Sequence, residues 1–162
     1  MTSGDFRRAA HVDFSLQEMA DRVAIRELVD AYAYCADRRD ATSQMALFTE
    51  HTDFQVYMDA SSSQPAQHIQ GRAALAPVFD ELNVYEVTMH FNGQSSTILD
   101  GQNATGITYC LAHHVKVEGT RRSLMIAAIR YLDTFVKQDG VWYFSQRKLI
   151  VDWTEIHALV TE

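Results

Sequence analysis

The fold class is decided by residues 104–138, which read ATGITYCLAHHVKVEGTRRSLMIAAIRYLDTFVKQ. Two long runs rich in β-branched and aromatic residues flank Glu118-Gly119-Thr120, and a glycine between two such runs is typical of a hairpin turn. Similar glycine breaks stand at residues 100–102 and 138–140, so the pattern extends in both directions. We therefore predict four long antiparallel strands over Glu86–Asp100, Ala104–Glu118, Ser123–Gln138 and Trp142–Trp153.

A long helix is predicted before these strands. Ser15 and Glu18 have the spacing of a capping box, which marks a helix start. The helix should end near Asp37–Asp40, where Asp-Arg-Arg-Asp interrupts the apolar pattern. Residues 1–15 are expected to form a flexible leader, and residues 16–162 a single domain. The apolar stripe of the helix consists of Met19, Val23, Leu28 or Val29, Tyr32 and Cys35/Ala36.

Shorter elements are expected between the long helix and the strands. In chain order these are a helix over Thr42–Phe48, a strand with Phe54, Val56 and Met58 on one face, a loop over Ala60–Gln67 and a helix over Gly71–Leu82. Helices first and a strand meander afterwards imply an α+β fold. We expect a cone-shaped α+β barrel in which a curved antiparallel sheet wraps around the N-terminal helices, with a small-molecule pocket at its mouth.

Composition argues against several classes of function. The 162 residues contain 14 Lys plus Arg against 21 Asp plus Glu, and the net charge of −7 argues against binding to nucleic-acid phosphates. The longest apolar runs, Leu124–Ile129 and Leu149–Val151, are too short to span a membrane. No zinc-binding spacing occurs, so no metal site is predicted. Cys35 and Cys110 are too few for a disulfide framework, and we expect a cytoplasmic protein.

Two residues far apart in the sequence are candidates for acid–base chemistry. His90 lies in the predicted strand segment VTMHFN, and the pattern leaves open which face of the sheet it occupies. Asp37 follows the apolar segment 31–36, and a carboxylate at a helix end is unfavourable for the helix dipole. The structural alternatives are a surface or satisfied core histidine and a loop aspartate paired with a neighbouring arginine.

Two further residues are weaker candidates. Arg147 stands between apolar residues of the last strand, where it needs an anion, a carbonyl group or solvent. Tyr32 can share a cavity with Asp37 only if the helix loosens or ends before Asp37. A surface arginine and a buried tyrosine with a satisfied hydroxyl are the alternatives. His113 and His114 are adjacent, so they should point to opposite faces of a strand and cannot chelate one metal ion.

The order of these elements resembles the SnoaL-like branch of the nuclear-transport-factor-2-like superfamily. The resemblance rests on AIREL at 24–28, GRAAL at 71–75 and GVWYF at 140–144, and it runs from about Leu16 to about Trp153. Within that superfamily the chain looks most like the cofactor-free lyases. These are scytalone dehydratase, hexachlorocyclohexane dehydrochlorinase and bile acid 7α-dehydratase.

The resemblance implies a catalytic pair and two assisting residues. The catalytic aspartate and histidine of those lyases fall at Asp37 and His90. Tyr32 falls where the bile acid enzyme has a tyrosine and the dehydrochlorinase a lysine, which favours a hydroxylated or keto substrate. Arg147 falls where the dehydrochlorinase has an arginine near its leaving group.

The reaction implied is a β-elimination or isomerisation that needs no metal or organic cofactor. His90 would remove a carbon-bound proton, and Asp37 would orient and stabilise it. Tyr32 or Arg147 would assist the leaving group or steady an enolate. A hydrophobic, cyclic substrate is expected in a pocket lined by Tyr34, Phe54, Met89, Met125, Ile129 and Trp153.

Two other classes of function fit the same scaffold. One is a polyketide cyclase, and the other is a non-catalytic ligand-binding or assembly module similar to the small subunit of aromatic-ring dioxygenases. A purely structural subunit would not need Asp37 and His90 in one cavity. Because an open sheet leaves one face and its edges uncovered, we expect a homo-oligomer, either a trimer or a dimer, without nucleic-acid or membrane partners.

Overall fold

The computed structural model describes residues 14–159, and nearly all of the leader predicted over residues 1–15 lies outside this range. Within residues 14–159, no helix is long and apolar enough to cross a membrane. The helical elements are α1 (Leu16–Arg38), α2 (Ala41–Ala46), η2 (Arg72–Ala74), α3 (Ala76–Asp80) and η3 (Glu81–Val84). The strands are β1 (Phe48–Tyr57), β2 (Gln67–Gln70), β3 (Val87–Asp100), β4 (Asn103–Glu118), β5 (Arg121–Gln138) and β6 (Val141–Ala158).

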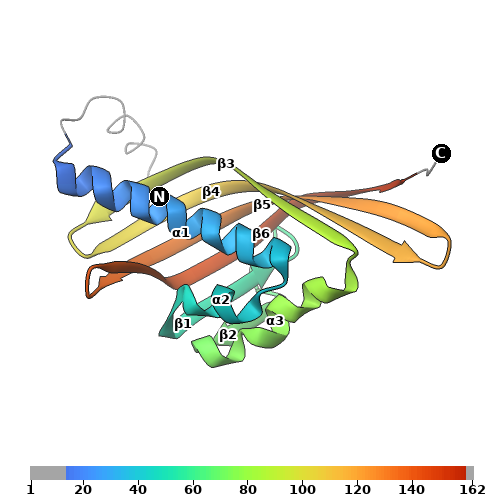
Figure 1. Ribbon diagram of the computed structural model, residues 1–162, viewed down its shortest axis with the longest axis horizontal. Helices are drawn as coiled ribbons and strands as arrows, with labels where there is room; N and C mark the ends of the chain where they lie inside the picture. Colours follow the sequence, from blue (N-terminus) through green and yellow to red (C-terminus); the bar gives the residue numbers. More distant parts are fainter. Residues whose placement is uncertain (1–13, 160–162) are drawn as a thin grey trace.

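The strands form one open, curved sheet in the order β2-β1-β6-β5-β4-β3, and α1 crosses its inner face (Figure 1). Strands β3 to β6 confirm the predicted antiparallel meander. Strand β1 runs parallel to β6, so the six-stranded sheet is mixed rather than antiparallel throughout. The parallel pairing is possible because the chain returns from β1 to β6 only after a long crossover through α3 and the meander.

Helix α1 begins as its sequence indicates. The Ser15 hydroxyl accepts a hydrogen bond from the Glu18 amide at 3.1 Å, and the Glu18 carboxylate accepts one from the Ser15 amide at 3.0 Å, which confirms the capping box. The predicted stripe is wrong at its start, because Met19 and Val23 are exposed. Asp21 is buried near this end because its carboxylate accepts hydrogen bonds from the Lys137 ammonium and the Trp142 indole.

Side chains of α1 cap the open edge of β3. As the last strand of the sheet, β3 has one row of backbone groups without a strand partner. Arg22 donates a hydrogen bond to the Thr97 carbonyl at 2.7 Å, and Arg26 donates one to the Gly93 carbonyl at 3.0 Å. These bonds hold α1 along the edge strand, so the last turn of the helix lies beside the start of β3.

The chain between α1 and β3 has more breaks than its sequence predicts. Helix α2 is capped by Asp40, whose carboxylate accepts a hydrogen bond from the Ser43 amide, but Phe48 already belongs to β1. The helix predicted over 71–82 is divided into η2, α3 and η3, because Pro77 has no amide hydrogen and fits only near the start of α3. Strand β2 is unpredicted, since four residues with the sequence QHIQ are too few and too polar for a strand pattern.

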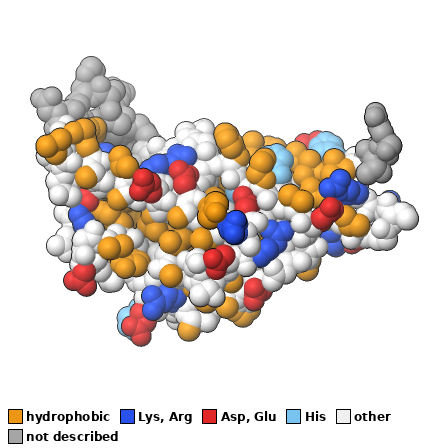
Figure 2. All heavy atoms as spheres, viewed as in Figure 1, with side chains coloured by type: hydrophobic (Ala, Val, Ile, Leu, Met, Phe, Trp, Pro, Cys, Tyr) orange, Lys and Arg blue, Asp and Glu red, His pale blue; other side chains and the backbone are white. Residues whose placement is uncertain are grey.

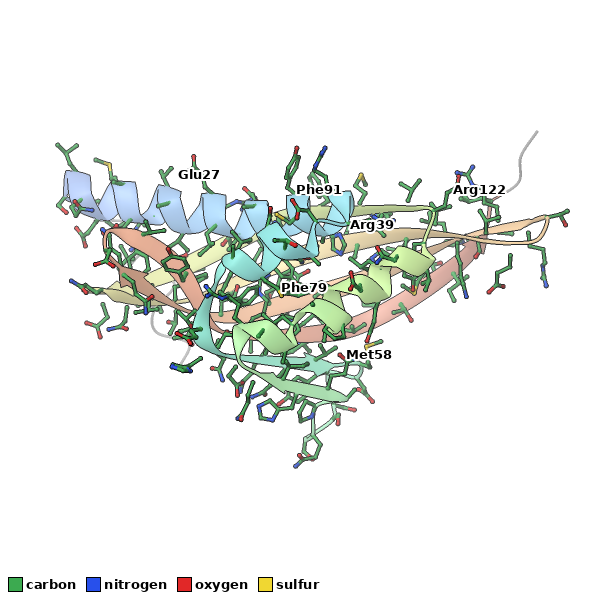
Figure 3. All side chains as sticks on the ribbon, turned by 60° about the horizontal axis from the view of Figure 1, so that its bottom comes forward. Glu27, Arg39, Met58, Phe79, Phe91 and Arg122 are labelled. Carbon is green, nitrogen blue, oxygen red and sulfur yellow. The ribbon has the colours of Figure 1, made fainter. Side chains whose placement is uncertain are left out.

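An aromatic cluster joins the helices to the sheet. Its neighbouring ring centroids lie 5.0–6.0 Å apart, most of them edge to face. Phe79 enters the cluster from α3, between that helix and the sheet (Figure 3). The cluster anchors α1, β1, α3 and β6 to one another. It consists of Tyr32, Phe48, Phe54, Phe79 and Phe144.

Two bulges interrupt the alternation of β6. Phe144 pairs with Phe135 but Gln146 pairs with Thr134, so Ser145 is an extra residue. In the same way Val151 pairs with Ile129 but Trp153 pairs with Ala128, so Asp152 is extra. Each extra residue moves the following side chains to the other face of the sheet. The first bulge turns Arg147 toward the interior, and the second turns Trp153 outward.

Candidate active site

Asp37 and His90 are in direct contact on the inner side of the sheet. Asp37 lies in the last turn of α1, and His90 lies on β3, facing that helix. Asp37 Oδ1 is 2.7 Å from His90 Nδ1, and Asp37 Oδ2 accepts a hydrogen bond from the His90 backbone amide at 2.9 Å. The His90 side chain is 7% exposed and that of Asp37 is 26% exposed. The face of His90, which the sequence leaves open, is therefore the inner one.

The surroundings of Asp37 favour its ionised form. Burial acts to raise the pKa of Asp37, but hydrogen bonds from the ring and the amide of His90 bring the pKa below its ordinary value of 3.8. An ionised carboxylate at Nδ1 favours the His90 tautomer that carries its proton there, which leaves Nε2 as the basic nitrogen. Within residues 14–159, Nε2 has no hydrogen-bond partner. The pair can therefore take up a proton at Nε2.

A second histidine, His114, lies beside this pair. Its ring centroid is 5.3 Å from that of His90 and 4.6 Å from that of Tyr85. His114 is 8% exposed, and neither ring nitrogen has a hydrogen-bond partner in the described part of the chain. Burial and then repulsion by His90 lower the pKa of His114 to about 4, so its ring is neutral at pH 7. Two unsatisfied nitrogens are costly in the interior, and a ligand oxygen would relieve that cost.

The sequence limits the inward-facing histidine of this strand to His113 or His114, but it does not choose between them. Adjacent strand residues point to opposite faces, so either His113 or His114 had to face inward. The register pairs His90 with Ala112, which places Ala112 and His114 on the same face as His90. Because the register belongs to the folded sheet, the strand pattern alone could not assign His114 to the site.

Arg147 is completely buried and forms a double hydrogen bond with Asp133. Its Nε and Nη2 atoms donate to Oδ1 and Oδ2 of Asp133, both at 2.8 Å. Burial opposes the charged form, but the Asp133 carboxylate raises the pKa of Arg147 above its ordinary value. The rings of Tyr32, Tyr131 and Phe144 lie 4.1–4.2 Å from the guanidinium carbon. Its Nη1 has no hydrogen-bond partner among the described residues.

Tyr32 belongs to this arginine cluster. Burial raises the pKa of Tyr32 to about 12, so its hydroxyl stays protonated at neutral pH. Neither Tyr32 nor Arg147 makes a hydrogen bond or ion pair with Asp37 or His90 within residues 14–159. The four predicted catalytic residues therefore form two groups, Asp37 with His90 and Tyr32 with Arg147.

Three of the six residues predicted to line the pocket face outward. Tyr34, Met89 and Trp153 are 63%, 51% and 51% exposed, respectively. Met89 directly precedes His90 on β3, so its side chain lies on the opposite face of the sheet. The second bulge of β6 turns Trp153 outward, and Tyr34 occupies the solvent side of α1, beneath the Arg38 guanidinium.

The other three predicted lining residues are on the inner side. Phe54 and Ile129 are buried in the core. Met125 is half-buried and lies opposite His114 in the register of β4 and β5. Of the six, Met125 is thus the residue that the sheet register places beside the histidines.

A separate groove runs beneath α1, toward the opposite end of the strands. It has a volume of about 540 Å³, and hydrophobic side chains gather over this part of the surface (Figure 2). Glu27 is its one charged lining residue, and none of the predicted catalytic residues contributes to it. The groove therefore offers apolar surface without the acid–base groups. It is lined by Ala24, Glu27, Leu28, Ala31, Ala46, Leu47, Gly140, Val141, Trp142 and Tyr143.

The sequence and the fold both match known proteins. The model of the SnoaL-like domain matches residues 17–148. The comparison with curated proteins finds no match. The evidence on relatives therefore comes from the domain model and from solved structures.

Solved structures with a similar fold belong to different functional classes. A protein from Novosphingobium aromaticivorans, provisionally described as a scytalone dehydratase, is 23% identical, with 88% of this chain and 91% of that chain covered and a TM-score of 0.72. A type 3 hexachlorocyclohexane dehydrochlorinase from Novosphingobium barchaimii is 18% identical, with coverage of 91% and 95% and a TM-score of 0.71. The β subunit of a provisionally described aromatic-ring-hydroxylating dioxygenase from Novosphingobium aromaticivorans is 20% identical, with coverage of 83% and 91% and a TM-score of 0.70. At these identities the likeness shows the fold alone.

Proposed function

The chain belongs to the SnoaL-like domain family, and from this premise we propose that it is a cofactor-independent lyase of the dehydratase type. The proposed substrate is a hydrophobic, cyclic small molecule with a hydroxyl group β to a carbonyl. The observation that carries the proposal is the contact between Asp37 and His90, which leaves Nε2 of His90 as a base on the inner side of the sheet.

In the proposed reaction, His90 removes one proton from the substrate and returns it to the leaving hydroxyl. His90 Nε2 takes the carbon-bound proton next to the carbonyl, and the ionised Asp37 stabilises the imidazolium that forms. The carbon–oxygen bond then breaks, and the imidazolium returns the proton to the leaving hydroxyl. A carbon–carbon double bond and one water molecule are the products. General base catalysis of this kind contributes roughly 10²–10⁴-fold to a rate.

His114 supports an oxygen-containing substrate beside His90. Its neutral ring offers one donor and one acceptor, and both are unsatisfied. The leaving hydroxyl can accept from one ring nitrogen of His114 while it stays within reach of His90. We assign His114 the task of holding that hydroxyl next to the base.

Arg147 and Tyr32 are suited to the carbonyl end of the substrate. The unpartnered Nη1 of Arg147 is a buried cationic donor, and such a donor stabilises the negative charge that develops on an enolate oxygen. The Tyr32 hydroxyl remains a neutral donor because its pKa is about 12. The Asp133 carboxylate keeps the guanidinium in place from its other side.

The test is water loss from a panel of cyclic β-hydroxy ketones, followed by the absorbance of the enone. The native protein should convert at least one member of the panel. His90→Gln and Asp37→Asn should each lower kcat by about 10²-fold or more. Full activity in either variant would remove the pair from the mechanism. Binding of the ketones without conversion would favour the ligand-binding alternative.

A second Asp–His pair provides the control. His68 Nε2 on β2 lies 2.7 Å from Asp53 Oδ2 on β1. It matches the Asp37–His90 pair in distance, but the His68 side chain is 44% exposed whereas that of His90 is 7% exposed. Asp53→Asn and His68→Gln should therefore leave kcat unchanged.

We also propose that the outer face of the sheet is where copies of this chain associate in a reducing, cytoplasmic compartment. The register places Phe91, Leu111, Ala128 and Trp153 in one row across β3, β4, β5 and β6. Phe91 is 64% exposed and projects away from the interior (Figure 3). Phe91, Leu111 and Trp153 are large and exposed, and such a group of apolar side chains on one face of a sheet is typical of a protein interface.

A further inference from the structure

Arg39 occupies an unusual position directly after α1. Its backbone adopts the left-handed conformation, with φ 59° and ψ 30°, which glycine adopts readily at a helix end. For a residue with a side chain this conformation costs roughly 1 kcal/mol. Such a cost at a position next to a functional pair calls for a compensating role of the side chain.

The Arg39 guanidinium makes three hydrogen bonds around the Asp37–His90 pair. Nη1 donates to the Thr88 hydroxyl at 2.8 Å and to the Asp37 carbonyl at 3.1 Å, and Nη2 donates to the Tyr85 carbonyl at 3.0 Å. Arg39 therefore joins the helix residue that carries the carboxylate to the segment that leads into His90. Figure 3 shows Arg39 between the end of α1 and the sheet.

Thr88 is the side chain through which the guanidinium can influence the carboxylate. It is buried, it lies two residues before His90 and it shares the inner face of β3 with that histidine. The Thr88 side chain is also one of the groups whose hydrogen bonding lowers the pKa of Asp37. Because the Thr88 oxygen accepts from Arg39 at 2.8 Å, its own hydrogen is free to point toward another acceptor.

Attachment of α1 to the sheet does not by itself require Arg39. Arg22 and Arg26 already donate to the Thr97 and Gly93 carbonyls along the same edge of β3. Arg26 also bonds to the Asn92 carbonyl and to Asp30 on its own helix. These two arginines resemble Arg39 in structural role, but in the described part of the chain they make no hydrogen bond with Thr88 or Asp37.

We propose that Arg39 is a positioning residue that, through Thr88 and the Asp37 backbone, holds the Asp37 carboxylate with one oxygen on the His90 ring and the other on the His90 amide. Only the importance of this orientation for catalysis rests on the proposed function. The orientation itself can be measured without a substrate.

The experiment compares Arg39→Gly with Arg26→Ala. Glycine keeps the left-handed backbone while it removes the guanidinium, so the fold is retained. In the native protein, ¹⁵N spectra of the histidine rings should show His90 protonated at Nδ1. In Arg39→Gly, both ring tautomers should be populated, and exchange of the His90 amide hydrogen should be about tenfold faster. Arg26→Ala should leave both signals of His90 unchanged.

A chemical rescue separates positioning from general loosening. Millimolar guanidinium added to Arg39→Gly should restore the Nδ1-protonated ring, because it can occupy the vacated position between Thr88 and Tyr85. Arg39→Asn, which also tolerates the left-handed conformation, serves as a second variant with the same expected change. An unchanged His90 tautomer in both Arg39 variants, or the same change in Arg26→Ala, would overturn the proposal.

Failure of the positioning role of Arg39 can be distinguished from failure of the proposed lyase mechanism. If Asp37→Asn retains full activity while Arg39→Gly still alters the His90 tautomer, the lyase mechanism fails and the positioning role stands. If the lyase mechanism holds, Arg39→Gly should lower kcat by about tenfold and leave KM nearly unchanged, because the positioned group acts in the transition state.

Discussion

Asp37 binds His90 with both of its carboxylate oxygens, one on the imidazole ring and one on the backbone amide. The amide belongs to the open edge of β3, which the arginines of α1 cap at other positions. The carboxylate therefore completes the edge of the sheet and orients the histidine at the same time. Asp53 is about as exposed as Asp37, at 28% against 26%, but within residues 14–159 it has no such backbone contact, and its second oxygen accepts from the side chains of Gln55 and Gln146.

Removal of the Asp37 side chain should cost stability as well as activity. Asp37→Ala leaves the His90 amide without an acceptor, which should lower the free energy of unfolding by about 1–3 kcal/mol. Asp37→Asn retains one oxygen for that amide and should lose less. Asp53→Ala, at the pair with the more exposed histidine, should cost less than about 1 kcal/mol. Urea unfolding at pH 7 measures all three, and an equal loss in Asp37→Ala and Asp53→Ala would contradict the double role of Asp37.

The neutral state of His114 predicts a loss of stability in mild acid. The unfolded chain protonates this ring below its ordinary pKa of 6.5, whereas the folded protein does so only near its pKa of about 4. The unfolded state therefore binds more protons as the pH falls, and His114 should contribute a loss of about 2 kcal/mol between pH 7 and pH 5. The lowered pKa of Asp37 acts in the same direction but at lower pH, outside this range.

His114→Phe isolates this contribution. The free energy of unfolding should fall less between pH 7 and pH 5 in the variant than in the native protein, by the same amount of about 2 kcal/mol. Urea unfolding of both proteins at the two pH values gives the comparison. Parallel pH profiles would mean that His114 is not held neutral by its surroundings.

The buried pair of Arg147 and Asp133 should be costly to break. Arg147→Met leaves the Asp133 carboxylate buried without its partner, and the expected loss is about 3–5 kcal/mol of unfolding free energy. The double variant Arg147→Met with Asp133→Leu should recover a large part of that loss, because no uncompensated charge remains. Differential scanning calorimetry of the single and double variants tests both expectations.

A more exposed pair is the comparison for this prediction. Arg130 forms a double hydrogen bond with Asp152 on the neighbouring strands, but both side chains are partly exposed. Arg130→Met should cost less than about 1 kcal/mol. A similar loss in Arg130→Met and Arg147→Met would show that burial does not govern the energy of these pairs.

The outer face of the sheet should control the oligomeric state. Phe91→Lys introduces a charge into the exposed apolar row and should reduce the assembly to a monomer, as measured by light scattering at fixed concentration. Val141→Lys is the matched control, since Val141 is also half exposed but lies in the groove beneath α1. An unchanged mass in Phe91→Lys would exclude this face as the interface.

Local patterns in the sequence predict much of the secondary structure. The capping box at Ser15 and the glycine turns of the meander depend only on residues a few positions apart, so they can be recognised without knowledge of the fold. The failures have causes that lie in another segment of the chain. The bulges at Ser145 and Asp152 have no sequence signature, because a bulge is defined by the strand opposite, and the second bulge turns Trp153 away from the side predicted for it.

The sequence by itself determined which groups are available for chemistry: an acid near the end of the first helix, a histidine on the first long strand, and an arginine between apolar residues on the last. Only the tertiary structure decided which of them meet. It brings together Asp37 and His90 across 53 positions of sequence, adds His114 through the register of β3 and β4, and directs Arg147 to Asp133. The physical reason is that neighbours across a sheet are set by hydrogen-bond register and bulges, which involve two chain segments at once and leave no mark in either one alone.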